Sequence, residues 1–330
     1  MNGEILKNLL ENGIENGAYP CYAAAVGGKE GVLFREFGGD RALYPDVLPI
    51  TEDTLFDMAS LSKLIGTTMA ALKLIESGRL SLESRVGDYF ESCCGKENTT
   101  IFELMTHTSG IKAHFPLWLR GINPNDAVAE SLREPFGYET GSNAVYTCMG
   151  YILLGKIIEK IENEPLDRVV KRLVFEPLGM KNSFYCPPAD KICAATERDA
   201  DSGEIICGVV HDENARFLGG VSGNAGIFCT LDDCIIFAEM LAKKGEGFIS
   251  KRIFELAITD HTPNFDEHRG LGFQLVGRRY GHTGFTGTSI FVHRDTQEYL
   301  ILLTNRVHPT RERAGLYNVR KSLNLEIFGE

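Results

Sequence analysis

The sequence is poor in positive charge. Its 34 lysines and arginines stand against 45 aspartates and glutamates, which gives a formal net charge of −11 over 330 residues. Nucleic acids carry dense negative charge, so a chain this acidic needs a local basic stripe to bind them. The basic clusters are short pairs, such as Lys243-Lys244 and Arg278-Arg279. We therefore expect no nucleic-acid partner.

Long apolar runs are lacking as well. The first twenty residues, MNGEILKNLLENGIENGAYP, have neither a basic start nor the apolar run of about 7–15 residues that a secretory signal needs. No later segment is apolar over the roughly 20 residues that span a bilayer. The nine cysteines are an odd number and never stand as Cys-x-x-Cys, which favours reduced thiols over disulfides. The sequence thus predicts a cytoplasmic protein without a membrane segment.

Paired metal-ligand spacings are also missing. Neither the nine cysteines nor the eight histidines show the close pairs that are typical of zinc sites. His211 and Asp212 are adjacent and could supply two ligands, but we favour a hydrogen-bonded loop for them. We expect neither a metal ion nor an organic cofactor.

The chain does contain an ordinary globular composition, with 43% hydrophobic and 24% charged residues, enough for a large core. Apolar spacing predicts strands near both ends and helices in between. This order favours one sheet built from both termini, with a mostly helical region inserted. The predicted helices cover 4–16, 60–77, 151–161, 166–174, 231–244 and 311–328, and the predicted strands cover 21–26, 31–37, 271–276, 288–292 and 299–303.

The segment Ser60-Leu61-Ser62-Lys63 can carry chemistry if it is helical. Residues three apart share one helix face, so the amine of Lys63 can reach the hydroxyl of Ser60. A serine is a poor nucleophile until a base takes its proton. Lys63 can be such a base only if its pKa falls, and burial and the positive end of the helix dipole are two local effects that could lower it. Backbone N–H groups at the helix start can also stabilise an oxyanion.

This short motif is weakly specific by itself. About 0.7 Ser-x-x-Lys matches are expected by chance in this composition, and a second match occurs at Ser109-Gly110-Ile111-Lys112. Gly110 favours a turn there, so we interpret Ser109 as structural. For Ser60 the alternative is a helix N-cap, which stabilises a helix by about 1 kcal/mol.

Longer stretches of the sequence, including the residues around Ser60, resemble a known protein family far more specifically than the short motif does. Five stretches follow one another as in the serine β-lactamase and penicillin-binding protein superfamily, in the branch of class C β-lactamases, D,D-carboxypeptidases and related esterases. The resemblance spans roughly residues 15–305. The stretches are Thr54 to Lys63, Leu104 to Gly110, Tyr146-Thr147-Cys148, Glu176 to Met180 and His282-Thr283-Gly284.

A further stretch, from His211 to Gly226, resembles a subgroup described as penicillin-binding protein 4B-like or β-lactamase-related esterase. Within it Ser222 is a rival nucleophile. It lacks the Gly-x-Ser-x-Gly elbow, because Asn224 stands in place of the second glycine, and no base is placed for it. We therefore prefer Ser60.

The resemblance implies an α/β (α+β) fold of the β-lactamase/transpeptidase type, with an antiparallel sheet from both termini flanked by helices. It implies a single catalytic unit over 1–330, with an α/β part at about 1–60 and 220–330 and a helical part at about 61–219.

The resemblance also implies residue roles. Ser60 forms an acyl-enzyme, and Lys63 and Tyr146 share the acid and base work. The N–H groups of Ser60 and Phe285 form the oxyanion hole. His282, Thr283 and Gly284 line an edge strand beside the scissile bond, where Thr283 can bind a substrate carboxylate.

Two positions depart from the pattern of the superfamily. His282 replaces a lysine, which is expected to make substrate binding depend on pH near ~6.5. Cys148 replaces an asparagine, and a thiol is a weak donor and acceptor. Efficient β-lactam hydrolysis is therefore not expected, whereas esters have a better leaving group.

The sequence thus predicts a serine hydrolase that acts on an ester, an amide or a D-amino-acid peptide, as an esterase or a D,D-carboxypeptidase. Its partner would be a small molecule or a short peptide. The departures at Cys148 and His282 motivate one alternative, a catalytically impaired binding module. A second alternative is a structural assembly protein. The oligomeric state stays open.

Overall fold

The computed structural model describes residues 2–329 and is built around a seven-stranded sheet with the strand order β3-β2-β1-β10-β9-β8-β7. Every neighbouring pair is antiparallel, and the two ends of the chain meet at the centre, where Ala24 of β1 is paired with Leu302 of β10. The prediction of one antiparallel sheet from both termini is confirmed. The strands are β1 (Cys21–Gly28), β2 (Gly31–Ala42), β3 (Leu48–Pro49), β7 (Gln274–Val276), β8 (Arg279–Thr283), β9 (Ser289–His293) and β10 (Tyr299–Thr304).

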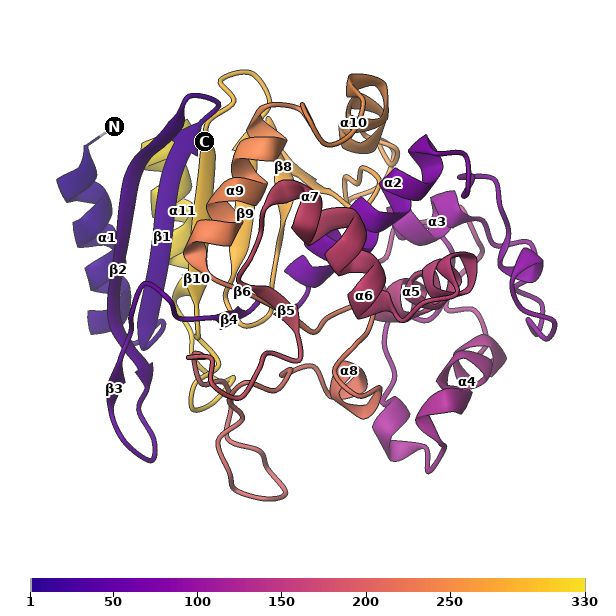
Figure 1. Ribbon diagram of the computed structural model, residues 1–330, viewed down its shortest axis with the longest axis horizontal. Helices are drawn as coiled ribbons and strands as arrows, with labels where there is room; N and C mark the ends of the chain where they lie inside the picture. The colour runs from indigo at the N-terminus through magenta and orange to yellow at the C-terminus, as the bar shows by residue number, and fades with distance from the viewer. Residues whose placement is uncertain (1, 330) are drawn as a thin grey trace.

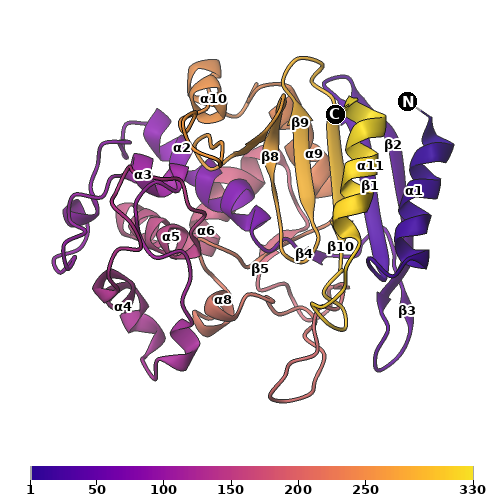
Figure 2. The ribbon, with the colours of Figure 1, turned by 180° about the vertical axis from the view of Figure 1, so that it is seen from behind.

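Helices cover both faces of this sheet (Figures 1 and 2). The first helix, α1 (Gly3–Glu15), and the last, α11 (Leu316–Phe328), lie side by side on one face, while α9 (Leu231–Ala242) lies on the other. Successive side chains of a strand point to opposite faces. In β1, accordingly, Tyr22 packs with α1 and α11, whereas Ala23 belongs to the core on the side of α9.

The segment between the sheet strands is mostly helical, as predicted, and adds a short sheet of order β4-β6-β5. The buried side chains of this segment form one continuous core with one face of the large sheet. This shared core supports a single unit over 1–330, which stays a prediction, as do the boundaries of its parts. The elements are β4 (Phe56–Asp57), β5 (Ser183–Tyr185), β6 (Ile227–Cys229), α2 (Met69–Glu76), α3 (Ile101–Thr106), α4 (Ala127–Arg133), α5 (Cys148–Glu162), α6 (Leu166–Val170), α7 (Glu176–Leu178), α8 (Glu213–Phe217) and α10 (Lys251–Ile258).

The helix that contains Lys63 is irregular at its start. A π-helical segment, Lys63–Thr68, runs directly into α2, so the two form one continuous helix. Isolated π-helical turns occur frequently at functional sites. None of the helices within residues 2–329 is long and apolar enough to span a membrane.

Candidate active site

Ser60 is presented by a strained turn between β4 and the helix that contains Lys63. The residue before it, Ala59, has φ 46°, a left-handed conformation that is costly for a residue with a side chain. The buried carboxylate of Asp57 holds this turn: Oδ1 accepts the N–H of Ala59 at 2.8 Å, and Oδ2 accepts the N–H of His211 at 2.7 Å. Such strain persists only where the surroundings fix it, and it clusters at functional sites.

The turn between β8 and β9 is fastened to the same segment. Thr286 Oγ1 donates to the carbonyl of Asp57 at 2.7 Å, and Thr288 Oγ1 donates to the carbonyl of Met58 at 3.1 Å. At Gly284 a Cβ would lie 2.5 Å from that Met58 oxygen, so only glycine permits this approach. These contacts bring His282, Thr283, Gly284 and Phe285 to Ser60, as Figure 2 shows for β8 and the start of the helix that leads into α2.

The predicted edge strand needs a correction. β7 lies outside β8 in the sheet, so β8 is not the outermost strand. However, β7 is paired only with Arg279, Tyr280 and Gly281. The outer side of His282 and Thr283 therefore extends past the end of β7 and faces the site.

Ser60, Tyr146 and the 282–285 segment line one cavity of about 350 Å³. Within residues 2–329, neither the N–H of Ser60 nor the N–H of Phe285 donates to a backbone or side-chain acceptor. Two free backbone donors at one cavity are what an oxyanion hole requires.

Lys63 reaches Ser60, as its helical spacing predicted. The ammonium Nζ lies 3.2 Å from Ser60 Oγ, 2.9 Å from the carbonyl oxygen of Asn224 and 3.5 Å from Cys148 Sγ. The Lys63 side chain is fully buried. The contact with Cys148 occupies the place where the superfamily pattern has an asparagine.

Tyr146 precedes α5 and lies against Lys63. Its ring centroid is 4.8 Å from Lys63 Nζ, and the next residue, Thr147, caps α5 by accepting the N–H of Gly150 at 3.2 Å. The Tyr146 hydroxyl is buried and makes no hydrogen bond of good geometry among residues 2–329, but it lies close enough to Lys63 and Ser60 for both to act on its pKa. Burial raises the pKa of Tyr146, and the positive charge of Lys63 opposes this rise.

The pKa of Lys63 does not fall, as a neutral lysine base would require. Burial acts to lower the pKa of Lys63, whereas the negative charge of Asp212 acts to raise it, as Cys148 and Tyr146 do once they are ionised, and the net pKa lies above its ordinary value. Burial and the helix dipole can be expected from the local sequence, whereas these three neighbours are all distant along the chain. Lys63 therefore holds its proton in the free protein.

His282 is neutral and has one free nitrogen. Its Nδ1 donates to the carbonyl of Thr283 at 2.7 Å, whereas Nε2 is buried and has no partner within residues 2–329. Burial, with the positive charges of Arg269 and Lys63, lowers the pKa of His282 to about 3. The expected pH dependence near 6.5 is therefore wrong, because the imidazole stays uncharged across the neutral range.

We expect this burial to make stability depend on pH. An unfolded chain binds protons on His282 and His107 below about pH 6.5, whereas the folded chain keeps both neutral, since burial also lowers the pKa of His107. Stability is then lost as pH falls from 6.5 toward 3. Each histidine should lower the free energy of unfolding by about 2 kcal/mol between pH 7 and pH 5. Urea titrations of wild type and His282→Gln measure this, and equal pH slopes for the two proteins would contradict it.

Sequence reasoning missed three residues of the cavity wall, Glu267, Arg269 and Gln274. Arg269 and Glu267 line the cavity and form an ion pair in which Arg269 Nε lies 3.1 Å from Glu267 Oε2. The Arg269 guanidinium also lies 5.4 Å from the ring centroid of Tyr146. No motif marks this pair, because both residues reach the site from an irregular segment before β7.

The structure excludes the rival nucleophiles. Ser109 is buried, and its partner in the second motif, Lys112, points away to Glu134 at 3.0 Å. Gly110 between them has φ 73°, which confirms the predicted turn. Ser222 Oγ donates to Asn224 Oδ1 at 2.6 Å and has no base beside it.

The loop at 211–212 is hydrogen-bonded, as we favoured. His211 Nε2 lies 2.9 Å from Glu197 Oε2, and Asp212 Oδ1 accepts the N–H of Ala215 at 2.8 Å. In the described part of the chain no three His, Cys, Asp or Glu side chains gather as a metal site would require.

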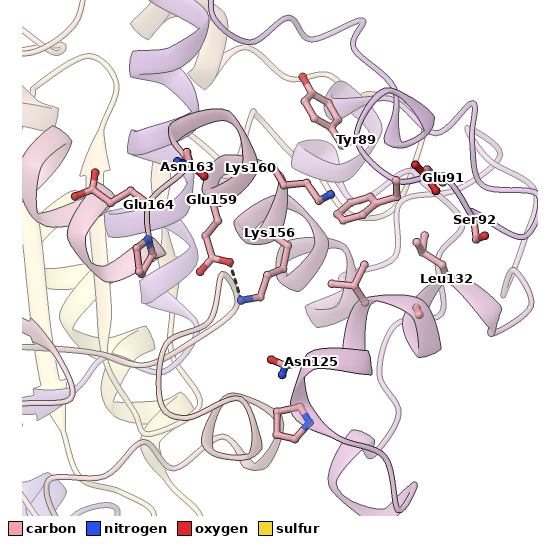
Figure 3. A pocket seen from close by; sticks show the side chains of 15 residues that line it. Tyr89, Glu91, Ser92, Asn125, Leu132, Lys156, Glu159, Lys160, Asn163 and Glu164 are labelled. Atoms are coloured by element: carbon pink, nitrogen blue, oxygen red, sulfur yellow. Dashed lines mark hydrogen bonds and ion pairs between the residues drawn. The ribbon is translucent and has the colours of Figure 1, made fainter.

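A larger cavity of about 1020 Å³ lies in the helical region, between α4, α5 and the segment at 89–92 (Figure 3). Its polar groups include Lys156, which contacts Glu159 at 2.7 Å, and Lys160. None of the predicted site residues lines it. Cavity size alone would therefore have pointed away from Ser60.

Comparisons with known proteins agree with this geometry. The chain is 28% identical over 312 residues to a "Putative D-alanyl-D-alanine carboxypeptidase" of Escherichia coli (strain K12), a match that covers 78% of this chain and 70% of that protein. It is 29% identical to an "N-acetylmuramyl-L-alanine amidase" of Bacillus subtilis (strain 168), over 77% of this chain and 68% of that protein. The fold is similar to that of the octameric penicillin-binding protein homologue from Pyrococcus abyssi, with TM-score 0.82, 22% identity and coverage of 100% of this chain and 78% of that chain.

The family description Beta-lactamase matches residues 6–324, nearly the whole chain. Together with the fold, this match confirms the resemblance found in the sequence. The protein belongs to the beta-lactamase family and is a serine hydrolase of the β-lactamase and penicillin-binding protein superfamily.

Proposed function

We propose that Ser60 is the nucleophile of this hydrolase and that it cleaves a small ester, an amide or a short D-amino-acid peptide through an acyl-serine. The observation that carries the proposal is the contact of 3.2 Å between Lys63 Nζ and Ser60 Oγ at a cavity with two free N–H donors. The buried Tyr146 hydroxyl lies in the same site, as does His282 Nε2, a buried atom without a partner among residues 2–329. Such atoms are costly unless a bound substrate satisfies them.

The reaction follows from these positions. Ser60 Oγ attacks the substrate carbonyl carbon while its proton passes to the pair formed by Lys63 and Tyr146. Tyr146 first releases its own proton to solvent, at a cost that the Lys63 ammonium lowers, and the resulting phenolate then accepts the Ser60 proton. The N–H groups of Ser60 and Phe285 stabilise the tetrahedral oxyanion. The leaving group departs with the proton, and water then hydrolyses the acyl-serine by the same path.

Two hydrogen-bond donors in the cavity wall suit a substrate with a carboxylate beside the scissile bond. Arg269 is a buried cation in the wall, and the Thr283 hydroxyl is a donor close by. Arg269 is already paired with Glu267, so a carboxylate would share the guanidinium. A cavity of about 350 Å³ suits a small molecule or a short peptide. The names of the two sequence relatives, a carboxypeptidase and an amidase, agree with such a substrate.

Cys148 sets a limit on the reaction. A thiol is a weaker hydrogen-bond partner than the amide in the superfamily pattern, so the site offers a substrate amide less help. We therefore propose faster turnover of esters than of β-lactams.

We further propose a cytoplasmic location. All nine cysteines are free, and buried thiols such as Cys21, Cys229 and Cys234 are compatible with a reducing compartment.

Active-site labelling tests the proposed function. The wild-type protein is incubated separately with a fluorophosphonate and with a penicillin, and its intact mass is followed with time. We expect one adduct per chain, found on Ser60 by peptide mapping, and turnover of an aryl acetate. A stable adduct without ester turnover would favour the binding module, and absence of any adduct would contradict the proposal.

A further inference from the structure

The strongest partner of Lys63 is a main-chain atom of a distant loop. The 2.9 Å contact of Nζ with the Asn224 carbonyl is shorter than its contacts with Ser60 Oγ and Cys148 Sγ, at 3.2 and 3.5 Å. A carbonyl is a strong acceptor, whereas a thiol is a weak one. The position of this ammonium therefore depends on how firmly the loop holds residue 224.

Side chains of the loop fix that carbonyl. The Asn224 side chain is fully buried, and its Oδ1 accepts the Ser222 hydroxyl at 2.6 Å while its Nδ2 donates to Asp212 Oδ1 at 3.1 Å. Asp212 Oδ1 also caps α8 by accepting the N–H of Ala215 at 2.8 Å. The amide of Asn224 is thus held at both ends, and one end is anchored to a helix.

The residue between Ser222 and Asn224 locks the loop against the helices that carry the site. At Gly223 a Cβ would lie 2.0 Å from the carbonyl oxygen of Tyr151 in α5. The Gly223 carbonyl accepts the Thr67 hydroxyl, one turn after Lys63, at 2.8 Å. The loop therefore contacts both helices with little freedom to move.

We propose that Ser222, Asn224 and Asp212 are positioning residues of the hydrolase, which hold the Asn224 carbonyl on Lys63 and so compensate for the missing amide at position 148. The inference rests on the proposed function, because Lys63 matters only if it serves Ser60. Three side chains outside the reacting groups thus hold the Lys63 ammonium in place, which Cys148 does only weakly.

The hydrogen-bonded group of Ser222, Asn224 and Asp212 also acts on Lys63 through its negative charge. A buried cation is costly unless a charge of opposite sign balances it. Asp212 is joined to Lys63 through the single residue Asn224, and it raises the pKa of Lys63. The Asp212→Asn variant keeps an oxygen for the helix cap but removes the charge. The titratable and charged groups that interact with Lys63 are Tyr146, Cys148, Tyr151, Asp212, His282 and His107, and Arg269 acts on the same two histidines and on Tyr151.

Removing one of these charges should move the pH profile. Without the carboxylate of Asp212, the positive charge of Lys63 is less balanced and eases ionisation of Tyr146 more, so the rising limb of kcat against pH should shift to lower pH by up to about one unit. A residue that only stabilised the fold would change the rate but not the position of this limb.

A comparison of two backgrounds tests the compensation. Ser222→Ala and Asn224→Ala are each made in wild type and in Cys148→Asn, and the rate of Ser60 acylation is measured. We expect losses of about 10-fold or more in wild type, because a misplaced Lys63 no longer meets Ser60, but less than about 3-fold in the Cys148→Asn background, where the introduced amide supplies an acceptor. Asn305→Ala is the matched control, since its buried amide bonds Cys21, Arg41 and Ala195 and contacts neither Lys63 nor residues 222–224. Its effect should be equal in both backgrounds.

Each outcome decides a separate claim. Equal losses in the two backgrounds, or an unchanged pH profile in Asp212→Asn, overturn the positioning role. If Ser60 is still labelled in wild type, the proposed function remains intact. Absence of Ser60 labelling in wild type overturns both. Should Asn224→Ala fail to fold, Ser222→Ala, which removes one hydroxyl, and Asp212→Asn still decide the matter.

Discussion

Ser60→Ala is expected to lower ester turnover by a factor of about 10⁴ to 10⁶ while leaving the fold intact. The variant has no oxygen that can bond to the acyl carbon, so the acyl-serine cannot form. Lys63 is the hydrogen-bond partner that the Ser60 hydroxyl loses, and the strained turn is held instead by Asp57. Steady-state hydrolysis of an aryl acetate and the intact mass after fluorophosphonate treatment measure the effect.

The second Ser-x-x-Lys motif provides a matched control for this prediction. Ser109 is buried, and its Oγ accepts the N–H of Ile111 at 3.3 Å, so Ser109→Ala should cost about 1 kcal/mol of stability. Its turnover should stay within about threefold of wild type, because no base lies beside it. A large loss of turnover in Ser109→Ala, or retained acylation in Ser60→Ala, would contradict the assignment of the nucleophile.

The sequence predicted well those elements whose signal is local. The helices expected at 4–16 and 231–244 correspond to Gly3–Glu15 and Leu231–Ala242, because apolar spacing and polar caps lie within each segment. The helix expected from residue 311 begins only at Leu316. Arg311 is held instead by Glu197, 114 residues away, and Gly315 has φ 102°. A contact at that distance in sequence leaves no periodic signal.

The strands β7 and β8 were also predicted poorly, because their local sequence patterns do not show where they begin. The strand expected at 271–276 begins at Gln274, because the N–H groups of Leu271 and Gly272 donate to Ala257 and Met105 rather than to a neighbouring strand. β8 was not expected from periodicity, since its charged and polar residues hide the pattern of a buried strand. The prediction of a strand at 282–283 came from the resemblance alone.

At the site, only the contact between Ser60 and Lys63 follows from spacing. Tyr146 and His282 reach the cavity through the fold, and the order of family motifs was the only signal for them. The Asn224 carbonyl is a backbone atom, so no side-chain pattern can mark it as the partner of Lys63. The low pKa of His282 comes from burial and from the charge of Arg269, and both are properties of the folded chain.

Lys63→Met is expected to lower turnover by about 10² to 10⁴ with little change in stability. The methionine fills a similar volume but cannot accept or donate a proton, and it removes the charge that eases ionisation of Tyr146. Replacing a buried charge by an apolar side chain of similar size is often neutral for stability, and here one carbonyl, that of Asn224, loses its donor. The free energy of unfolding should therefore change by less than about 2 kcal/mol. Ester turnover and urea unfolding of the same preparation measure the two effects.

A second buried lysine allows the two effects to be separated. Lys96 is 1% exposed and donates to the carbonyls of Leu132 and Glu134 at 2.8 and 2.5 Å, far from Ser60 in the helical region. Lys96→Met leaves one buried and one partly buried carbonyl without a donor, so it should lower stability by about 2–3 kcal/mol and keep turnover near wild type. If Lys63→Met instead lost stability and kept turnover, Lys63 would be a structural cation like Lys96. A catalytic lysine is expected to give the opposite result, a loss of turnover with stability retained.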